Sequence, residues 1–182
     1  MGKIILVTGG CRSGKSEYAE EILKDKNDVL YIATAKAYDE EMVDRIEKHK
    51  LRRNEKWDTY EGFKDLHLVI NETEKSYILL DCLTIMMTNL LFLEEQDFDN
   101  LSMDSVDKIL TNIKKQVEKM ISSAIENDKT LVMVTNEVGY GLVPEYKLGR
   151  IFRDVAGAIN KTVASLSDEV YLTVCGIPMK IK

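Results

Sequence analysis

The stretch that most constrains the fold of this chain is the octapeptide GGCRSGKS at residues 9–16. It fits the pattern G-x-x-x-x-G-K-[ST] at every fixed position, follows an apolar run at residues 4–7, and precedes a helical pattern over 17–23. A strand, a glycine-rich loop and a helix in this order cradle phosphate groups, because backbone N–H groups and the positive helix N-terminus face one concavity. Lys15 is expected to reach the β- and γ-phosphates of a nucleoside triphosphate, and the Ser16 hydroxyl to ligate Mg²⁺. The predicted phosphate-binding residues are Gly9, Gly10, Cys11, Arg12, Ser13, Gly14, Lys15 and Ser16.

Apolar runs alternate with helical patterns along the whole chain. The apolar runs predict strands at residues 4–7, 29–33, 77–80, 131–134 and 170–174. The three- and four-residue spacing of apolar residues predicts helices at 17–23, 39–50, 63–70, 82–93, 106–124 and 148–166. Continuous apolar strands separated by helices predict an α/β fold, with a mainly parallel sheet covered by helices on both faces. The length of 182 residues favours a single domain over residues 1–182.

Composition argues against several classes of partner. The chain has 25 basic and 31 acidic residues and a net charge of −6, which disfavours nucleic acid as a ligand. Cys11, Cys82 and Cys175 lie far apart and form no C-x-x-C pair, so neither a zinc site nor a disulfide framework is predicted, and a reduced cytoplasmic setting fits. We see no signal-peptide pattern and no apolar run near the length of a membrane span.

Several polar residues follow directly on predicted strands. Ligands of such sheets bind beyond the carboxyl ends of the strands, where Thr34, Asp81 and the pair Asn136 and Glu137 are expected to meet. Asp81 stands where proteins with a phosphate loop carry a second acidic residue that holds Mg²⁺, although aspartate is also a favoured helix N-cap. The loop at 135–144 contains two glycines and a proline, and a functional role there is about as well supported as an ordinary connection.

A basic segment, residues 45–53, carries one of the two histidines. On a helix Arg45 and His49 share a face, so His49 is expected among cations. Nearby positive charge lowers the pKa of an imidazole and favours its neutral form, which could attack a phosphorus and hold the product covalently. Spacing alone favours the plainer alternative, an incidental histidine on a solvated basic face. His67 has no comparable setting and is predicted to be a surface or structural residue.

Together these segments resemble the bifunctional adenosylcobinamide kinase / adenosylcobinamide-phosphate guanylyltransferase family of cobalamin biosynthesis, almost from end to end. The phosphate loop is generic, whereas the His49 segment and the 135–144 loop are specific. The matching residues are Val7 to Gly10, Arg12 to Ser16, Tyr31 to Thr34, Glu41, Met42, Arg45, Ile46, His49, Trp57, Glu61, Asp81 to Thr84, Thr88, Asn89, Thr135 to Gly139, Phe152 to Asp154, Gly157, Asn160, Gly176 to Pro178 and Lys180.

This resemblance implies a RecA-like fold with a phosphate loop, a homotrimer, and two successive reactions. In the first, a nucleoside triphosphate such as ATP or GTP phosphorylates the aminopropanol hydroxyl of adenosylcobinamide. In the second, a histidine attacks the α-phosphate of GTP, pyrophosphate leaves, and GMP passes to the cobinamide phosphate to give adenosylcobinamide-GDP. Nucleotide and corrinoid are implied to bind near subunit boundaries.

The resemblance also assigns site residues. His49 matches the guanylylated histidine, with Lys15 as the second catalytic residue, and Ser16 with Asp81 as Mg²⁺ ligands. Further nucleotide contacts are implied for Thr34, Ala35, Lys36, Lys50, Leu51, Arg52, Arg53, Glu61 and Asp81. The chain departs from the family pattern at Lys48, where some members have a second histidine, at Asp81, which is often Glu, and at Cys11, which is often Ala.

Two rival functions fit parts of the sequence. A small-molecule kinase without the guanylyltransferase step would need the phosphate loop and Asp81 but no nucleophilic His49. A GTP-dependent switch protein is disfavoured because the chain has no N-K-x-D guanine-reading motif. Trapping a labelled guanylyl group on the protein would separate the bifunctional enzyme from both.

Overall fold

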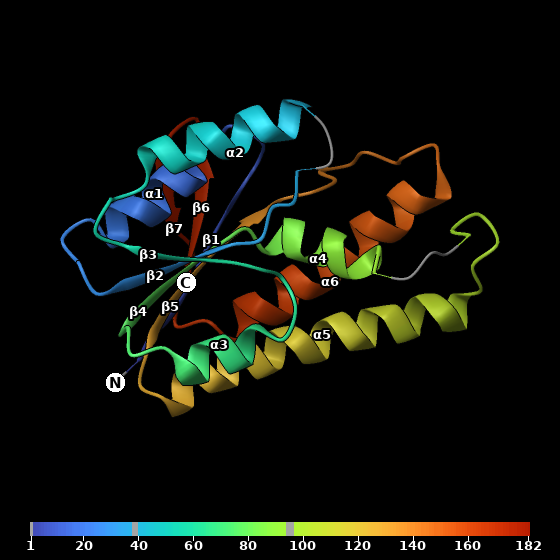
Figure 1. Cartoon of the computed structure of the whole chain (residues 1–182). Coiled ribbons are helices and arrows are strands. Elements are labelled where there is room, and N and C mark those ends of the chain that lie inside the picture. Colours follow the sequence, from blue (N-terminus) through green and yellow to red (C-terminus); the bar gives the residue numbers. More distant parts are fainter. Residues whose placement is uncertain (1, 38–39, 94–96) are drawn as a thin grey trace.

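The structure is a computed structural model that describes residues 2–37, 40–93 and 97–182, with the backbone alone described at positions 41, 45 and 52. A seven-stranded sheet runs through it, with helices packed on both of its faces (Figure 1). The strands are β1 (Ile4–Gly9), β2 (Val29–Ala33), β3 (Asp58–Glu61), β4 (Tyr77–Asp81), β5 (Thr130–Asn136), β6 (Glu169–Val174) and β7 (Ile177–Lys180). The helices are α1 (Lys15–Ile22), α2 (Glu40–Arg52), α3 (Leu66–Glu72), α4 (Leu83–Leu91), α5 (Met103–Glu126) and α6 (Lys147–Leu166).

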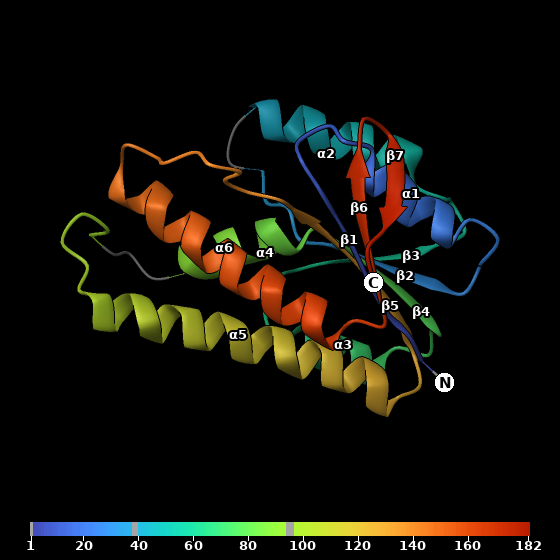
Figure 2. The same ribbon diagram turned by 180° about the vertical axis from the view of Figure 1, so that it is seen from behind.

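The strand order in the sheet is β3-β2-β4-β5-β1-β6-β7. Every pair is parallel except β6 and β7, which form an antiparallel hairpin at one edge (Figure 2). The strand of the phosphate loop, β1, lies in the interior between β5 and β6. Parallel strands point their carboxyl ends to the same edge, so the segments after β1, β2, β4 and β5 meet there.

Two apolar cores lie on opposite faces of the sheet because successive strand residues point to opposite sides. On one face Ile4 and Leu6 pack with α3, α4, α5 and α6. On the other face Ile5 and Val7 pack with Ala19 and Leu23 of the α1 region. The predicted α/β class, with a mainly parallel sheet and helices on both faces, is confirmed.

The sequence analysis missed both edge strands. The side chains of β3 are all exposed, and so are those of β7, so neither strand has the continuous apolar run that marks a buried strand. β7 also contains Pro178, a residue that sheets tolerate at their edges.

The predicted helices are all present, but some of their bounds differ. α1 begins at Lys15 rather than at 17, and α3 begins at Leu66 rather than at 63. Residue 39, the first of the helix predicted at 39–50, lies outside the described residues. In the described ranges no helix is both long and apolar enough to cross a membrane.

Candidate active site

A large open cavity, of about 1620 Å³, lies at the carboxyl edge of the sheet. Its walls come from the phosphate loop, the segments after β2, β4 and β5, and the inner side of α2. Ligand pockets for one drug-sized molecule usually measure about 300 to 1,000 Å³, so this cavity has room for a nucleotide and a second substrate. The residues that sequence analysis placed at strand ends therefore share one site.

The phosphate loop forms the floor of this cavity. Lys15 is buried at the start of α1, and its Nζ donates to the Gly10 carbonyl oxygen at 3.1 Å, which folds the side chain back over the loop. Gly14 has a φ of 91°, and a Cβ placed on it would lie 3.0 Å from Cα of Gly176. Glycine is therefore required at Gly14 both by its left-handed backbone and by the close approach of the β6–β7 turn.

Asp81, at the end of β4, links three parts of the site. Its Oδ1 lies 3.5 Å from the Ser16 hydroxyl, while its Oδ2 accepts a hydrogen bond from the Tyr31 hydroxyl at 2.5 Å. The same Oδ2 lies 3.4 Å from His49 Nδ1, longer than a short hydrogen bond. Burial alone would raise the pKa of the Asp81 carboxyl, but the neighbouring His49, Tyr31 and Arg53 outweigh burial and hold this pKa below its usual value.

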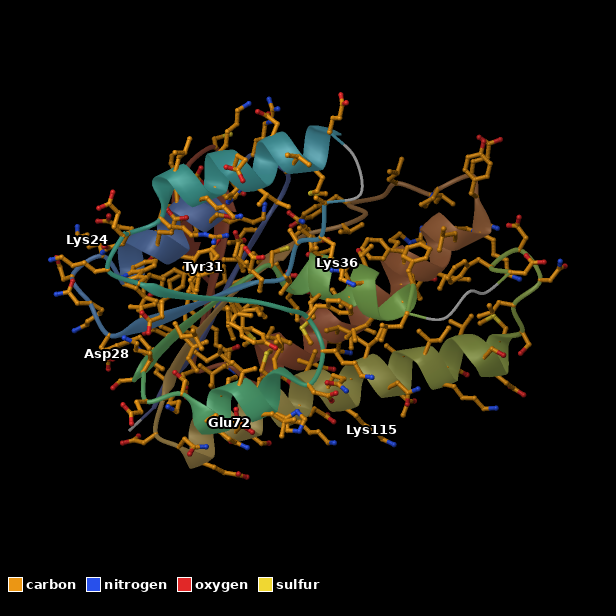
Figure 3. The ribbon with its side chains drawn as sticks, in the orientation of Figure 1. Lys24, Asp28, Tyr31, Lys36, Glu72 and Lys115 are labelled. Carbon is orange, nitrogen blue, oxygen red and sulfur yellow. The ribbon has the colours of Figure 1, made fainter. Side chains whose placement is uncertain are left out.

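Tyr31 is a member of the site that sequence analysis assigned no role. It lies in a fully buried strand, on the face of the sheet that carries α1 (Figure 3). Burial, followed by the Asp81 charge and hydrogen bond, raises the pKa of its hydroxyl far above the usual value, so this group stays protonated as a donor. The only sequence signal for this role is a polar tip within an otherwise apolar strand.

His49 is presented by α2 and is half-buried against the cavity. Sequence analysis predicted cations around it, and the structure adds the carboxylate of Asp81 as a direct neighbour. Arg53 stacks over the Tyr31 ring at 4.0 Å, and Lys50 lies between Glu61 at 3.5 Å and Glu47 at 3.7 Å. The side chains of Arg45 and Arg52 lie outside the described residues.

The other predicted nucleotide contacts have mixed placements. The buried Thr34 hydroxyl exchanges hydrogen bonds of 2.9 Å with the backbone of Cys82, so its side chain braces two strand ends. Ala35 and Lys36 line the cavity, and Lys36 is labelled in Figure 3. The Lys36 ammonium lies 4.4 Å from the centre of the Phe63 ring. Leu51 is 85% exposed and is not among the residues that line the cavity.

A closed ring of hydrogen bonds fixes the end of β5. Thr135 donates to Asn160 Oδ1 at 2.8 Å, the Asn160 amide donates to the Asn136 carbonyl at 3.0 Å, and the Asn136 N–H donates to Thr84 Oγ1 at 2.7 Å. The Thr135 hydroxyl has one proton, and it donates this proton to Asn160. In the contact of 3.2 Å between the Thr84 and Thr135 hydroxyl oxygens, Thr84 must therefore be the donor. The ring joins β5 to α4 and α6, and residue spacing alone did not reveal it.

Ser16 and Asp81 are the residues that could hold a divalent cation. Their hydroxyl and carboxylate oxygens face one another beside the phosphate loop, and Mg²⁺ prefers oxygen ligands shared with substrate phosphates. Within the described parts of the chain, no group of three His, Cys, Asp or Glu residues could hold a metal alone. The donor set thus fits a cation that arrives with the nucleotide.

Comparison with known proteins gives the family. The family model described as "Cobinamide kinase / cobinamide phosphate guanyltransferase" matches residues 5–181. The chain belongs to this family.

Curated relatives match nearly their whole length. The "Bifunctional adenosylcobalamin biosynthesis protein CobU" of Escherichia coli (strain K12) is 43% identical over 98% of this chain and 99% of that protein. The protein of the same name from Salmonella typhimurium is 42% identical over 98% of this chain and 99% of that protein. The "Bifunctional adenosylcobalamin biosynthesis protein CobP" of Pseudomonas aeruginosa is 33% identical, over 97% of this chain and 96% of that protein. The predicted resemblance to the cobinamide kinase and guanyltransferase family is confirmed.

Proposed function

We propose that this chain phosphorylates adenosylcobinamide from a nucleoside triphosphate and then transfers GMP from GTP to the product through a guanylyl-histidine at His49. The observation that supports this most directly is the juxtaposition of a phosphate loop and a histidine in one cavity, joined by Asp81. Phosphoryl transfer to a hydroxyl requires a positioned triphosphate, whereas nucleotidyl transfer through the enzyme also requires a nucleophile. The cavity contains a phosphate loop that can position a triphosphate and a histidine that can act as the nucleophile.

In the kinase step the phosphate loop and Lys15 hold the triphosphate and stabilise the charge of the transferred phosphoryl group. Mg²⁺ held by Ser16 and Oδ1 of Asp81 would neutralise charge on the β- and γ-phosphates. The acceptor oxygen bonds to the γ-phosphorus as the bond to the leaving nucleoside diphosphate breaks. The buried position of Lys15 at the helix N-terminus keeps its ammonium directed into the loop.

In the guanylyl step, His49 is the nucleophile. A neutral imidazole whose Nδ1 carries the proton faces Oδ2 of Asp81 and leaves the lone pair of Nε2 free. Nε2 bonds to the α-phosphorus of GTP while the bond from that phosphorus to pyrophosphate breaks. An oxygen of the cobinamide phosphate then displaces the imidazole, which restores His49 and yields adenosylcobinamide-GDP.

The remaining nucleotide contacts extend this proposal. Beyond the phosphate loop, Lys36, Lys50 and Arg53 are cations on the cavity wall that would meet phosphates, with Glu61 beside Lys50. Thr34, Ala35, Leu51 and Arg52 complete the proposed nucleotide-binding set.

We also propose a homotrimer that works in the cytoplasm, without nucleic acid. Family resemblance supports the trimer, the three unpaired cysteines support a reducing compartment, and the acidic composition disfavours nucleic acid. Light scattering after size exclusion would test the trimer, because a mass near that of one 20.8 kDa chain contradicts it.

The central experiment traps the guanylyl group. Incubation of the protein with α-labelled GTP, without corrinoid, should label the peptide that carries His49, through a phosphoramidate that mild acid cleaves and base spares. His49→Ala should abolish the label and keep some kinase activity, whereas His67→Ala, which changes the other histidine, should keep both. Lys15→Ala should weaken triphosphate binding by about 2 kcal/mol, roughly 30-fold, since it removes a charge-assisted contact, and both activities should fall.

Two results would overturn the assignment. An acid-labile adduct that persists in His49→Ala would place the nucleophile elsewhere. A wild-type protein that phosphorylates the corrinoid without ever forming an adduct would be a small-molecule kinase alone.

A further inference from the structure

The cavity is lined by six carboxylates, and they differ in what they contact. Asp81 is engaged with Tyr31 and His49, and the other lining acids except one also have partners. Asp44, Glu47 and Glu61 form ion pairs with lysines of α2. Glu17 also has an interaction partner. Among the described acids that line the cavity, Glu137 is the one whose carboxylate forms neither an ion pair nor a hydrogen bond.

Glu137 is attached to the phosphate loop by its backbone. Its N–H donates to the carbonyl of Gly9 at 2.9 Å, one residue beyond the point where Gly9 pairs with Asn136 between β1 and β5. Glu137 is half-buried and lines the same cavity as Lys15 and Ser16. A carboxylate in this place lies at the carboxyl end of the strand adjacent to the phosphate loop, the edge at which ligands of such sheets bind.

The hydrogen-bond ring restrains the backbone next to this carboxylate. Thr84, Thr135, Asn136 and Asn160 close the ring on the residue that immediately precedes Glu137. The backbone that enters Glu137 is therefore restrained twice, by the ring through Asn136 and by Gly9 through the N–H of Glu137. Such a restrained backbone suits a group that must meet a substrate atom at hydrogen-bond distance.

We infer that Glu137 is the general base of the kinase step, an inference that rests on the proposed function. Its carboxylate accepts the proton of the substrate's aminopropanol hydroxyl as the oxygen bonds to the γ-phosphorus. The bond between that phosphorus and the leaving nucleoside diphosphate breaks, and its electron pair stays on the diphosphate. Asp81 is unsuited to this task, because its oxygens already face Ser16, Tyr31 and His49.

The guanylyl step needs no such base. The imidazole of His49 attacks without losing a proton to the protein, and a cobinamide phosphate already carries negative oxygens. Glu137→Gln, which keeps size and hydrogen-bonding capacity but removes basicity, should therefore damage one reaction and spare the other. General-base removal lowers rates by roughly 10²- to 10⁴-fold, and we expect kinase kcat to fall within that range.

The experiment measures three quantities in wild type, Glu137→Gln and the control Glu145→Gln, whose carboxylate is exposed in the same loop. They are phosphorylation of adenosylcobinamide from γ-labelled nucleotide, adduct formation from α-labelled GTP, and GMP transfer to adenosylcobinamide phosphate supplied ready-made. The inference predicts that only the first falls, and only in Glu137→Gln. Glu137→Asp, which retracts the base by one methylene, should recover part of the lost rate.

Each other outcome has a definite meaning. Unchanged kinase turnover in Glu137→Gln overturns the inference while leaving the proposed function intact. A parallel loss of adduct formation overturns it too, since Glu137 would then serve nucleotide or metal binding common to both steps. Failure of the wild-type protein to phosphorylate the corrinoid would instead refute the proposed function itself.

Discussion

At the scale of single residues, the two oxygens of Asp81 have different neighbours. Oδ1 faces the Ser16 hydroxyl of the phosphate loop, and Oδ2 faces Tyr31 and His49. The carboxylate is thus shared between the proposed metal site and the proposed nucleophile. A residue in this position can couple the presence of a metal-bound triphosphate to the orientation of the imidazole, because both depend on the same side chain.

Glu169 forms a second, structural cluster whose effect depends on pH. Its carboxylate lies 2.7 Å from both Lys3 and Lys180 and 2.9 Å from the Tyr171 hydroxyl. The hydrogen bonds from Lys180 and Lys3 lower its pKa to about 2. A depressed folded-state pKa stabilises the protein above the unfolded-state pKa of about 4.3, and this stabilisation is lost as pH falls toward 2.

Glu169→Gln should therefore destabilise the protein at pH 7 by about 1 kcal/mol, a modest amount because the lysine partners are partly exposed. Urea titrations from pH 7 to pH 2 should show the difference from wild type shrinking below about pH 4.3. Glu118→Gln, which alters an exposed helix pair with Lys114, is the control and should have little effect at any pH. A difference that stays constant across this range would contradict the assignment.

At the scale of elements, α2 and α5 are held very differently. Among the described side chains of α2 none is fully buried, and Met42, Ile46 and His49 are half-buried. α5 buries a continuous stripe that includes Val106, Val117 and Ala124. Local opening is easiest where little apolar surface is buried, so the helix that carries the nucleophile is weakly anchored.

Hydrogen exchange should show this difference directly. The amides of α2 should exchange much faster than those of α5 in the free protein, and GTP should slow exchange in α2 by engaging Lys50, Arg53 and His49. Protection in α2 equal to that in α5 before nucleotide is added would argue against weak anchoring.

The ring that joins β5, α4 and α6 should contribute measurably to stability. Asn160→Ala removes the acceptor of the Thr135 hydroxyl proton and the side-chain donor to the Asn136 carbonyl, and an unsatisfied buried group costs about 1 to 3 kcal/mol. We expect a loss of about 2 kcal/mol in the free energy of unfolding, measured by urea denaturation. Lys161→Ala, on the exposed side of the same helix, should change it little, and equal effects of the two substitutions would disprove the role of the ring.

At the scale of the whole molecule, the interior could be predicted from sequence and the edges could not. β1, β2, β4 and β5 are buried on both faces and carry continuous apolar runs, and the partly buried β6 also has one, whereas β3 and β7 are exposed and carry none. The gathering of the phosphate loop, Asp81 and Glu137 at one edge follows from parallel topology alone.

The contacts within the site were less predictable. The bond from Tyr31 to Asp81 depends on the register between β2 and β4, in which Ala33 pairs with Asp81. The contribution of Asn160 depends on how α6 packs against β5. Neither contact can be read from the spacing of residues along the sequence, since each forms only when distant segments pack together.

The approach of the β6–β7 turn to the phosphate loop has a consequence for biosynthesis. The N–H of Gly176 donates to the Ser13 carbonyl at 2.8 Å, so the phosphate loop is braced by a turn that is synthesised much later than the loop itself. β1 also lacks both of its sheet neighbours until β5 and β6 have been synthesised. A nascent chain on the ribosome thus carries the phosphate-binding sequence before the strands that complete its site exist, so we expect nucleotide to assist only those folding steps that follow the synthesis of β5 and β6.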